Sequence, residues 1–110
     1  MAFQEKNLGQ AEIANGSNTT LYTVPASTVA IVKDIQIVNT TGTAATITIW
    51  IDPDGTTADD TTAIIKDWSV PANDFLHWSG FKVMTATATI KATAGTASAI
   101  TVTIDGAEIT

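Results

Sequence analysis

The abundance of β-branched residues constrains this chain more than any other feature of its sequence. It contains 21 Thr, 13 Ile and 7 Val, so 41 of its 110 residues branch at Cβ, whereas Leu occurs only three times. β-Branched side chains lose rotamer freedom on a helix and pack well on a pleated sheet. We therefore expect an all-β protein.

The order of the residues supports this expectation, because apolar and polar residues alternate with a period of two. Isoleucines alternate with Thr and Trp over 46–51, and similar alternation covers 85–92 and 98–105. No segment of helical length shows a 3.6-residue period, and runs rich in Gly, Pro and Asn separate the alternating segments. The expected strands span 8–14, 19–24, 28–39, 44–52, 61–67, 74–83, 85–92 and 98–105.

About eight short strands with turns at this spacing predict a single antiparallel β-sandwich, of the jelly-roll or another Greek-key type. The length suits one domain. Residues 1–7 precede the first expected strand, so we predict an N-terminal arm over 1–7, held by a partner, and a sandwich domain over 8–110.

Composition excludes several functional classes. The formal net charge is -6 and Arg is absent, so the chain lacks the basic surface of a nucleic-acid-binding protein. Without Cys it forms no disulfide. Its apolar runs are far shorter than the roughly 20 residues that cross a membrane. The first residues do not resemble a signal peptide, so we expect synthesis in a cytoplasm.

Three segments carry a resemblance to a known family. Residues 21–26 read LYTVPA, residues 39–41 read NTT after a long expected strand, and 70–74 read VPAND before another. This pattern, with the closing strand up to residue 109, resembles a widespread family of small phage virion structural proteins. The likeness spans roughly residues 8–109. The aromatic-rich stretch 68–81 departs from the family, whose members usually carry aliphatic residues there.

The resemblance implies a β-sandwich in a phage particle and transfers no catalytic motif. It favours a non-enzymatic virion structural protein, and in particular a capsid decoration (cement) protein that binds the major capsid protein or other virion proteins. The family's habit implies a homo-oligomer, with a trimer favoured. The expected location is the virion, after synthesis in the bacterial host cytoplasm. The alternative is a carbohydrate-binding domain of a phage tail or fibre, in which Trp50 or Trp78 would contact glycans.

The single histidine of the chain is a candidate catalytic residue. His77 is the only possible imidazole base, Ser79 shares its strand face, and Asp74 is close in sequence. Nothing resembling a strand-to-helix nucleophile elbow surrounds these residues. We therefore expect His77 to be a structural or interface residue, and we predict no catalytic residue.

The segment 52–60 concentrates acidic side chains in one polar loop. Asp52, Asp54, Asp59 and Asp60 could supply oxygen ligands to Ca²⁺. Their spacing does not fit an EF-hand, and no bidentate Glu follows. We therefore expect a solvated or contact loop, without a metal or cofactor.

The aromatic residues are the candidates for a contact surface. Trp50 is predicted on the outward, Thr-bearing face of its strand, where an aromatic favours an interface. In 74–83, Leu76 and Trp78 alternate with Phe75 and His77, so both faces of this strand are apolar and both should be covered by protein. The predicted interface residues are Trp50, Trp68, Phe75, His77, Trp78, Phe81 and, from the arm, Phe3.

Overall fold

A computed structural model describes residues 2–14 and 18–110, and this part of the chain consists of strands and connecting turns. No helix long and apolar enough to cross a membrane is found in the described residues. The strands are β1 (Phe3–Glu12), β2 (Thr19–Thr23), β3 (Val29–Asn39), β4 (Ala45–Asp52), β5 (Ala63–Val70), β6 (Phe75–Met84), β7 (Thr89–Ala94) and β8 (Ile100–Ile109).

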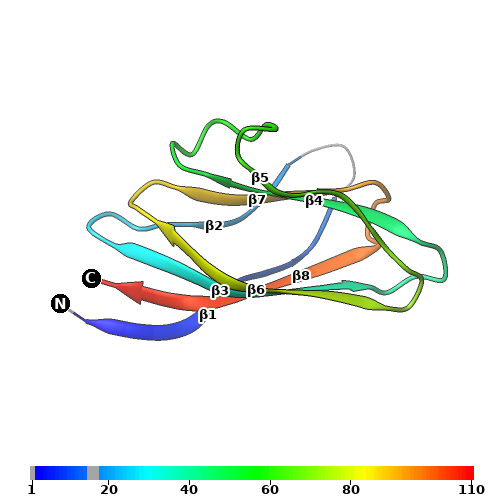
Figure 1. Ribbon diagram of the computed structural model, residues 1–110, viewed down its shortest axis with the longest axis horizontal. Coiled ribbons are helices and arrows are strands. Elements are labelled where there is room, and N and C mark those ends of the chain that lie inside the picture. Colours follow the sequence, from blue (N-terminus) through cyan, green and yellow to red (C-terminus); the bar gives the residue numbers. More distant parts are fainter. Residues whose placement is uncertain (1, 15–17) are drawn as a thin grey trace.

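The eight strands form two antiparallel four-stranded sheets that face each other, as Figure 1 shows. The strand order is β1-β8-β3-β6 in the first sheet and β2-β7-β4-β5 in the second. Successive strands repeatedly change sheets, which produces the two interlocked Greek keys of an eight-stranded jelly roll. The predicted all-β sandwich is confirmed, and so is the expected number of strands.

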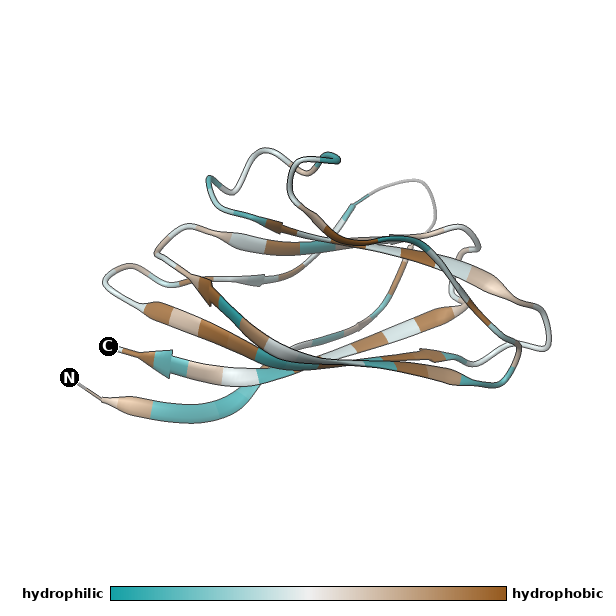
Figure 2. Cartoon of the chain, in the orientation of Figure 1, coloured by the Kyte–Doolittle hydropathy of each residue, from teal (hydrophilic) through white to brown (hydrophobic). Residues whose placement is uncertain are grey.

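Isoleucine fills the space between the sheets. Ile35 and Ile37 of β3 and Ile104 of β8 point inward from the first sheet, and Ile47 and Ile49 of β4 point inward from the second. These five side chains are at most 1% exposed. Figure 2 shows the resulting alternation of hydrophobic and hydrophilic positions along the strands. Burial of these branched side chains supplies the main driving force for folding.

The N-terminal residues belong to the sandwich, so the predicted strand boundary is wrong. β1 begins at Phe3, which pairs with Ile109 of β8, and the pairing continues to Glu12 with Thr101. The described residues of the expected arm 1–7 are therefore sheet residues from Phe3 onward. The sequence did not predict this part of β1 because the residues from Phe3 to Asn7 are all exposed, so no apolar alternation marks the strand.

The last strand also exceeds its predicted end, residue 105, and continues through Gly106 to Ile109. Gly106 resembles a turn residue in the sequence, but here it permits close contact between neighbouring strands. A Cβ at this position would lie 2.0 Å from the carbonyl oxygen of Ile31. A glycine inside a strand often marks such a close backbone approach.

A polar cluster joins the two sheets at the end where the termini lie. The hydroxyl of Tyr22 on β2 donates to Glu108 on β8, and Lys6 on β1 lies 3.2 Å from the same carboxylate. Partial burial, followed by the Glu108 contact, raises the pKa of Tyr22 well above its usual value. The hydrogen bond from Tyr22 lowers the pKa of Glu108. The cluster therefore favours a neutral phenol beside an ionised carboxylate.

Asn39 lies at the opposite end of the sandwich, where β3 ends. Its side chain is fully buried and donates to the carbonyls of Thr43 (2.9 Å) and Val70 (3.1 Å). Its side-chain oxygen accepts from both the backbone N–H and the hydroxyl of Thr41. One side chain thereby fixes the β3–β4 turn and ties it to the end of β5.

Candidate interaction surface

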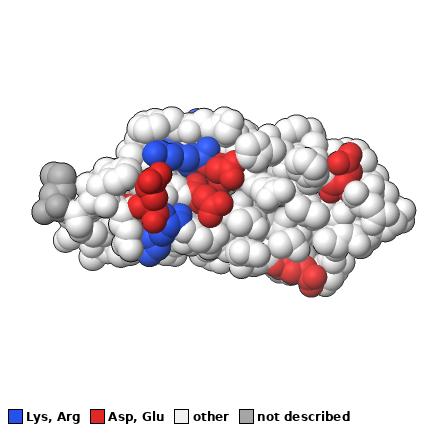
Figure 3. Space-filling view, turned by 90° about the horizontal axis from the view of Figure 1, so that it is seen from below, with Lys and Arg blue, Asp and Glu red and all other residues white. Residues whose placement is uncertain are grey.

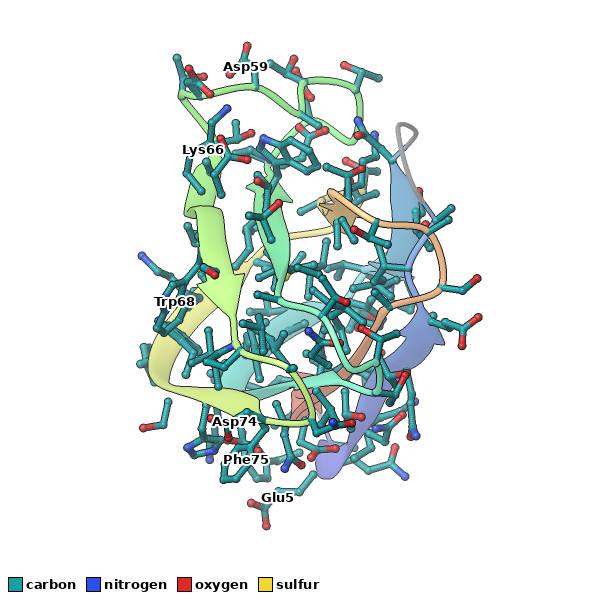
Figure 4. The ribbon with its side chains drawn as sticks, turned by 90° about the vertical axis from the view of Figure 1, so that its right-hand side faces the viewer. Glu5, Asp59, Lys66, Trp68, Asp74 and Phe75 are labelled. Atoms are coloured by element: carbon teal, nitrogen blue, oxygen red, sulfur yellow. The ribbon has the colours of Figure 1, made fainter. Side chains whose placement is uncertain are left out.

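One long side of the sandwich, where β5 and β6 form the edges of their sheets, carries most of the exposed large apolar side chains. They are Trp68 on β5 and Phe75, Phe81 and Val83 on β6, with exposed fractions of 41%, 55%, 64% and 56%. Figure 4 shows Trp68 on this side and Phe75 at the start of β6. We call this surface, defined by Trp68, Phe75, Phe81 and Val83, the β5–β6 side.

The register of β6 explains why it is apolar on both faces. Trp78 pairs with Ile35 of β3, and Leu76 pairs with Ile37, so both follow their buried partners inward. They are partly buried and pack against the core. Phe75 and His77 alternate with them and are exposed. The predicted apolar character of both faces is confirmed, whereas protein cover on the outer face stays a prediction.

Trp50 is not an outward contact residue, and that prediction is wrong. It lies on the outer face of β4 but is only 7% exposed, and its neighbours on that face, Thr48 and Asp52, are also buried. The connection between β4 and β5 folds back over this face, as Figure 1 shows. The backbone N–H of Ile51 donates to Thr62 at the end of that loop. The loop thus occupies the place that the sequence suggested for a partner.

Phe3 is exposed, but it lies far from the other candidates in the sheet. It belongs to β1, the edge strand opposite β6, and its ring lies 5.7 Å from the ammonium of Lys33. Figure 3 shows the outer face of the first sheet, where side chains of both charges gather in a cluster near the termini and other acidic side chains lie toward the opposite end. Within this cluster Lys33 lies 4.0 Å from Glu5. Phe3 is therefore not part of the β5–β6 side.

His77 makes its polar contact with a residue that the sequence did not suggest. Its Nε2 contacts the carboxylate of Asp34 on β3, while Asp74 accepts from the backbone N–H of Phe75. Ser79 pairs with Asp34 across the strands, so the three side chains share one face. Within the described residues no hydrogen bond joins Ser79 to His77, and the His77–Asp34 pair links β6 to β3.

The acidic loop uses its carboxylates internally. Asp54 accepts from the backbone of Thr56, which is the main reason that its pKa is lowered, and Asp59 accepts from Thr61 with the same effect. Asp60 pairs with Lys66 at 2.9 Å, which raises the pKa of the lysine. No group of three metal-ligating side chains occurs over residues 2–14 and 18–110.

Asp52 differs from the other acidic residues because it is fully buried. The ammonium of Lys91 lies 3.6 Å from its carboxylate and donates to the carbonyl of Gly55 at 3.1 Å. The positive charge that a metal would supply is therefore supplied by a lysine of β7. The hydrogen bond from Lys91 to Gly55 also fastens the loop to the outer face of the second sheet.

Sequence reasoning missed Val83 as a surface residue. Its position could have been found by continuing the alternation of β6 past Phe81, because residues two apart on a strand share a face. Its strand partner is Ile31 of β3.

Comparison with known proteins assigns no family. No protein-family model matches the chain, and no curated protein sequence matches it significantly. Among solved structures, a chain from the structure of infectious bursal disease virus, Gt strain, aligns with 96% of this chain at 12% identity and a TM-score of 0.32. This chain spans 31% of that chain's length. At this TM-score the alignment assigns neither fold nor function.

Proposed function

We propose that the chain is a non-enzymatic structural protein of a phage particle, acting as a capsid decoration protein. The observation that carries the proposal is the β5–β6 side, an exposed aromatic surface on a jelly-roll sandwich. Jelly rolls occur in viral capsid domains and also in lectin domains, so the fold is compatible with the proposal and the exposed surface carries it. Large exposed apolar side chains concentrated on one side of a domain are typical of contacts with other proteins. The location in a phage particle is inferred from the family resemblance, and the contact with other proteins is inferred from the exposed surface.

The mechanism is mechanical. Neighbouring virion subunits, further copies of this chain included, would bury the aromatic side chains of the β5–β6 side. Free energy gained on binding only the assembled lattice stabilises that lattice by mass action. The negative net charge and the absence of Arg favour contact with protein rather than with the packaged nucleic acid.

The carbohydrate-binding alternative is weakened by burial. Trp50 lies beneath the β4–β5 loop, and Trp78 is partly buried against the core, so both indoles are less available for sugar stacking than an exposed tryptophan. Trp68 is the tryptophan with a large exposed fraction. We therefore prefer the protein-contact function.

The test is binding to undecorated phage heads. We expect Phe75→Ala and Trp68→Ala each to weaken binding by about thirtyfold, which corresponds to the roughly 2 kcal/mol of an interface hot spot. Thr101→Ala, a partly exposed polar position on the first sheet, is the control and should bind normally. Folded aromatic variants that bind like wild type, or a wild-type chain that ignores heads and binds glycans, would overturn the proposal.

A further inference from the structure

A group of polar side chains lies buried on the outer face of the second sheet, beneath the loop 53–62 that connects β4 to β5. Figure 4 shows this loop at the top of the molecule, where Asp59 is labelled. The group consists of Trp50 and Asp52 on β4 and of Thr89 and Lys91 on β7, and we call these four residues the polar patch. Asp52 is wholly buried, and Trp50 and Thr89 are only 7% and 6% exposed.

The pairing of β4 with β7 brings the four side chains together. Asp52 pairs directly with Thr89, and Trp50 pairs directly with Lys91. Directly opposed residues have Cβ atoms about 5 Å apart on one face of the sheet, and residues two apart along a strand lie about 7 Å apart on that face. The four side chains therefore start from the corners of one small rectangle beneath the loop.

The loop approaches the polar patch most closely at Gly55. The carbonyl of Gly55 accepts from the ammonium of Lys91 at 3.1 Å, and its backbone N–H donates to the carbonyl of Asp52 at 3.3 Å. Gly55 has a φ of 78°, and a Cβ there would lie 2.8 Å from the carbonyl oxygen of Thr87. Glycine is therefore required for the loop to lie this close to the start of β7.

The polar patch holds polar atoms that the protein itself does not satisfy. Every enclosed side-chain nitrogen or oxygen without a hydrogen-bond partner among the described residues belongs to it: Nε1 of Trp50, both carboxylate oxygens of Asp52 and Oγ1 of Thr89. Lys91 lies 3.6 Å from the carboxylate, which balances its charge but is too distant for a hydrogen bond. Enclosed polar groups in native proteins are nearly always bonded, either to protein or to ordered water.

We propose that the polar patch is a binding site for internal water, in which at least one ordered water molecule bridges Trp50, Asp52 and Thr89 beneath the loop. Water accepts two hydrogen bonds and donates two. It accepts from the indole N–H of Trp50 and donates to the carboxylate of Asp52, while the hydroxyl of Thr89 can serve in either role. Buried water typically makes about three such bonds to groups that otherwise lack partners. This inference is independent of the proposed function.

The chemistry of the polar patch favours water over a metal ion. The indole N–H of Trp50 and the ammonium of Lys91 can only donate, so neither can ligate a cation, and the ammonium repels one. The acidic side chains still make a cation the alternative to test. After the contact with Thr56, a contact with Asp52 also lowers the pKa of Asp54, so the two carboxylates are neighbours.

The first test is a high-resolution crystal structure of the chain. We expect an ordered water molecule within hydrogen-bonding distance of Nε1 of Trp50 and of the carboxylate of Asp52. Because this measurement uses the unaltered chain, it does not depend on the folding of any variant. A polar patch without ordered water at these atoms would overturn the inference.

The second test counts long-lived internal waters in solution by the ¹⁷O relaxation dispersion of water, which proton exchange with hydroxyl or ammonium groups does not affect. Thr89→Val removes one polar partner and keeps a similar side-chain shape, so the count should fall by about one. The matched control is Thr93→Val, at a partly exposed position on the same face of β7, and its count should equal that of the wild type. An equal loss in both variants, or no loss in either, would contradict the site.

A third measurement distinguishes water from a cation. We expect millimolar Ca²⁺ to leave the melting temperature of the chain unchanged. A rise of several degrees that is abolished by Asp54→Asn, a change at an exposed position, would overturn the inference and would identify a cation site instead.

Discussion

Replacing Asn39 with Ala should cost this small domain a large part of its stability. The side chain is fully buried and makes four hydrogen bonds, two donated to the carbonyls of Thr43 and Val70 and two accepted from Thr41. Its amide is therefore close to saturated, which is the condition under which truncation costs most.

The magnitude follows from what each partner does after the substitution. The groups of Thr41 and Thr43 lie near solvent and can bond to water, so those three bonds lose about 1 kcal/mol each. Val70 is fully buried, and its carbonyl is left with a further penalty of about 1–3 kcal/mol. The expected loss is about 4–6 kcal/mol, out of the roughly 5–15 kcal/mol typical of a domain.

Urea unfolding followed by tryptophan fluorescence measures this loss, provided that the slope with urea is unchanged. The melting temperature should fall by roughly 15–50 °C. Gln36→Ala, an exposed position on the same strand, is the control and should change stability by less than about 0.5 kcal/mol. A loss below about 1 kcal/mol for Asn39→Ala would refute the reasoning, because it would mean that the corner does not depend on this amide.

Four other expected outcomes concern buried or partly buried contacts. Lys91→Met should cost about 3–5 kcal/mol by urea unfolding, because it leaves the fully buried Asp52 without its charge partner; a loss under about 1 kcal/mol would show that the carboxylate escapes to water. Ile35→Ala should cost about 2–5 kcal/mol in the same assay, since its side chain is wholly enclosed, and a smaller loss would mean that the core collapses around the gap. The pKa of Tyr22 is higher in the folded chain than the value near 10 of the unfolded chain, so its contribution to stability is complete below about pH 10 and is lost as pH rises further. Tyr22→Phe should therefore weaken the loss of stability at alkaline pH. The lowered pKa of Glu108 has the opposite sign, so Glu108→Gln should weaken the loss as pH falls below about 4.5; unchanged pH profiles in these two variants would contradict the coupling.

Much of the fold was predictable because the sandwich core imposes a period of two on the sequence. The alternation of Ile47, Ile49 and Ile51 with Thr and Trp identified β4 within one residue of its start. The limits of β1 and β8 were not predictable in this way. Their paired ends have exposed or small residues such as Phe3 and Gly106, so the backbone pairing leaves little trace in the side-chain pattern.

The candidate surface was only partly predictable, for a different reason. Alternation places a side chain on the inner or outer face of its sheet, but it does not reveal whether a loop covers the outer face. Trp50 and Trp68 both look like surface residues in sequence, yet a loop covers the first and leaves the second exposed. Similarly, the distance between His77 and Asp34 in sequence, 43 residues, concealed their contact across neighbouring strands.

The position of β8 in the first sheet has a consequence for the speed of folding. β8 is the last strand of the sequence and lies between β1 and β3, so the first sheet stays divided until the whole chain is available. Pairing Phe3 with Ile109 requires closure of a loop nearly as long as the chain. Closing so long a loop costs chain entropy before the contacts it brings together can stabilise the fold. We therefore expect folding in milliseconds to seconds rather than microseconds. Until β8 is in place, the strands beside it present open edges, and this interval is when the chain is most exposed to aggregation.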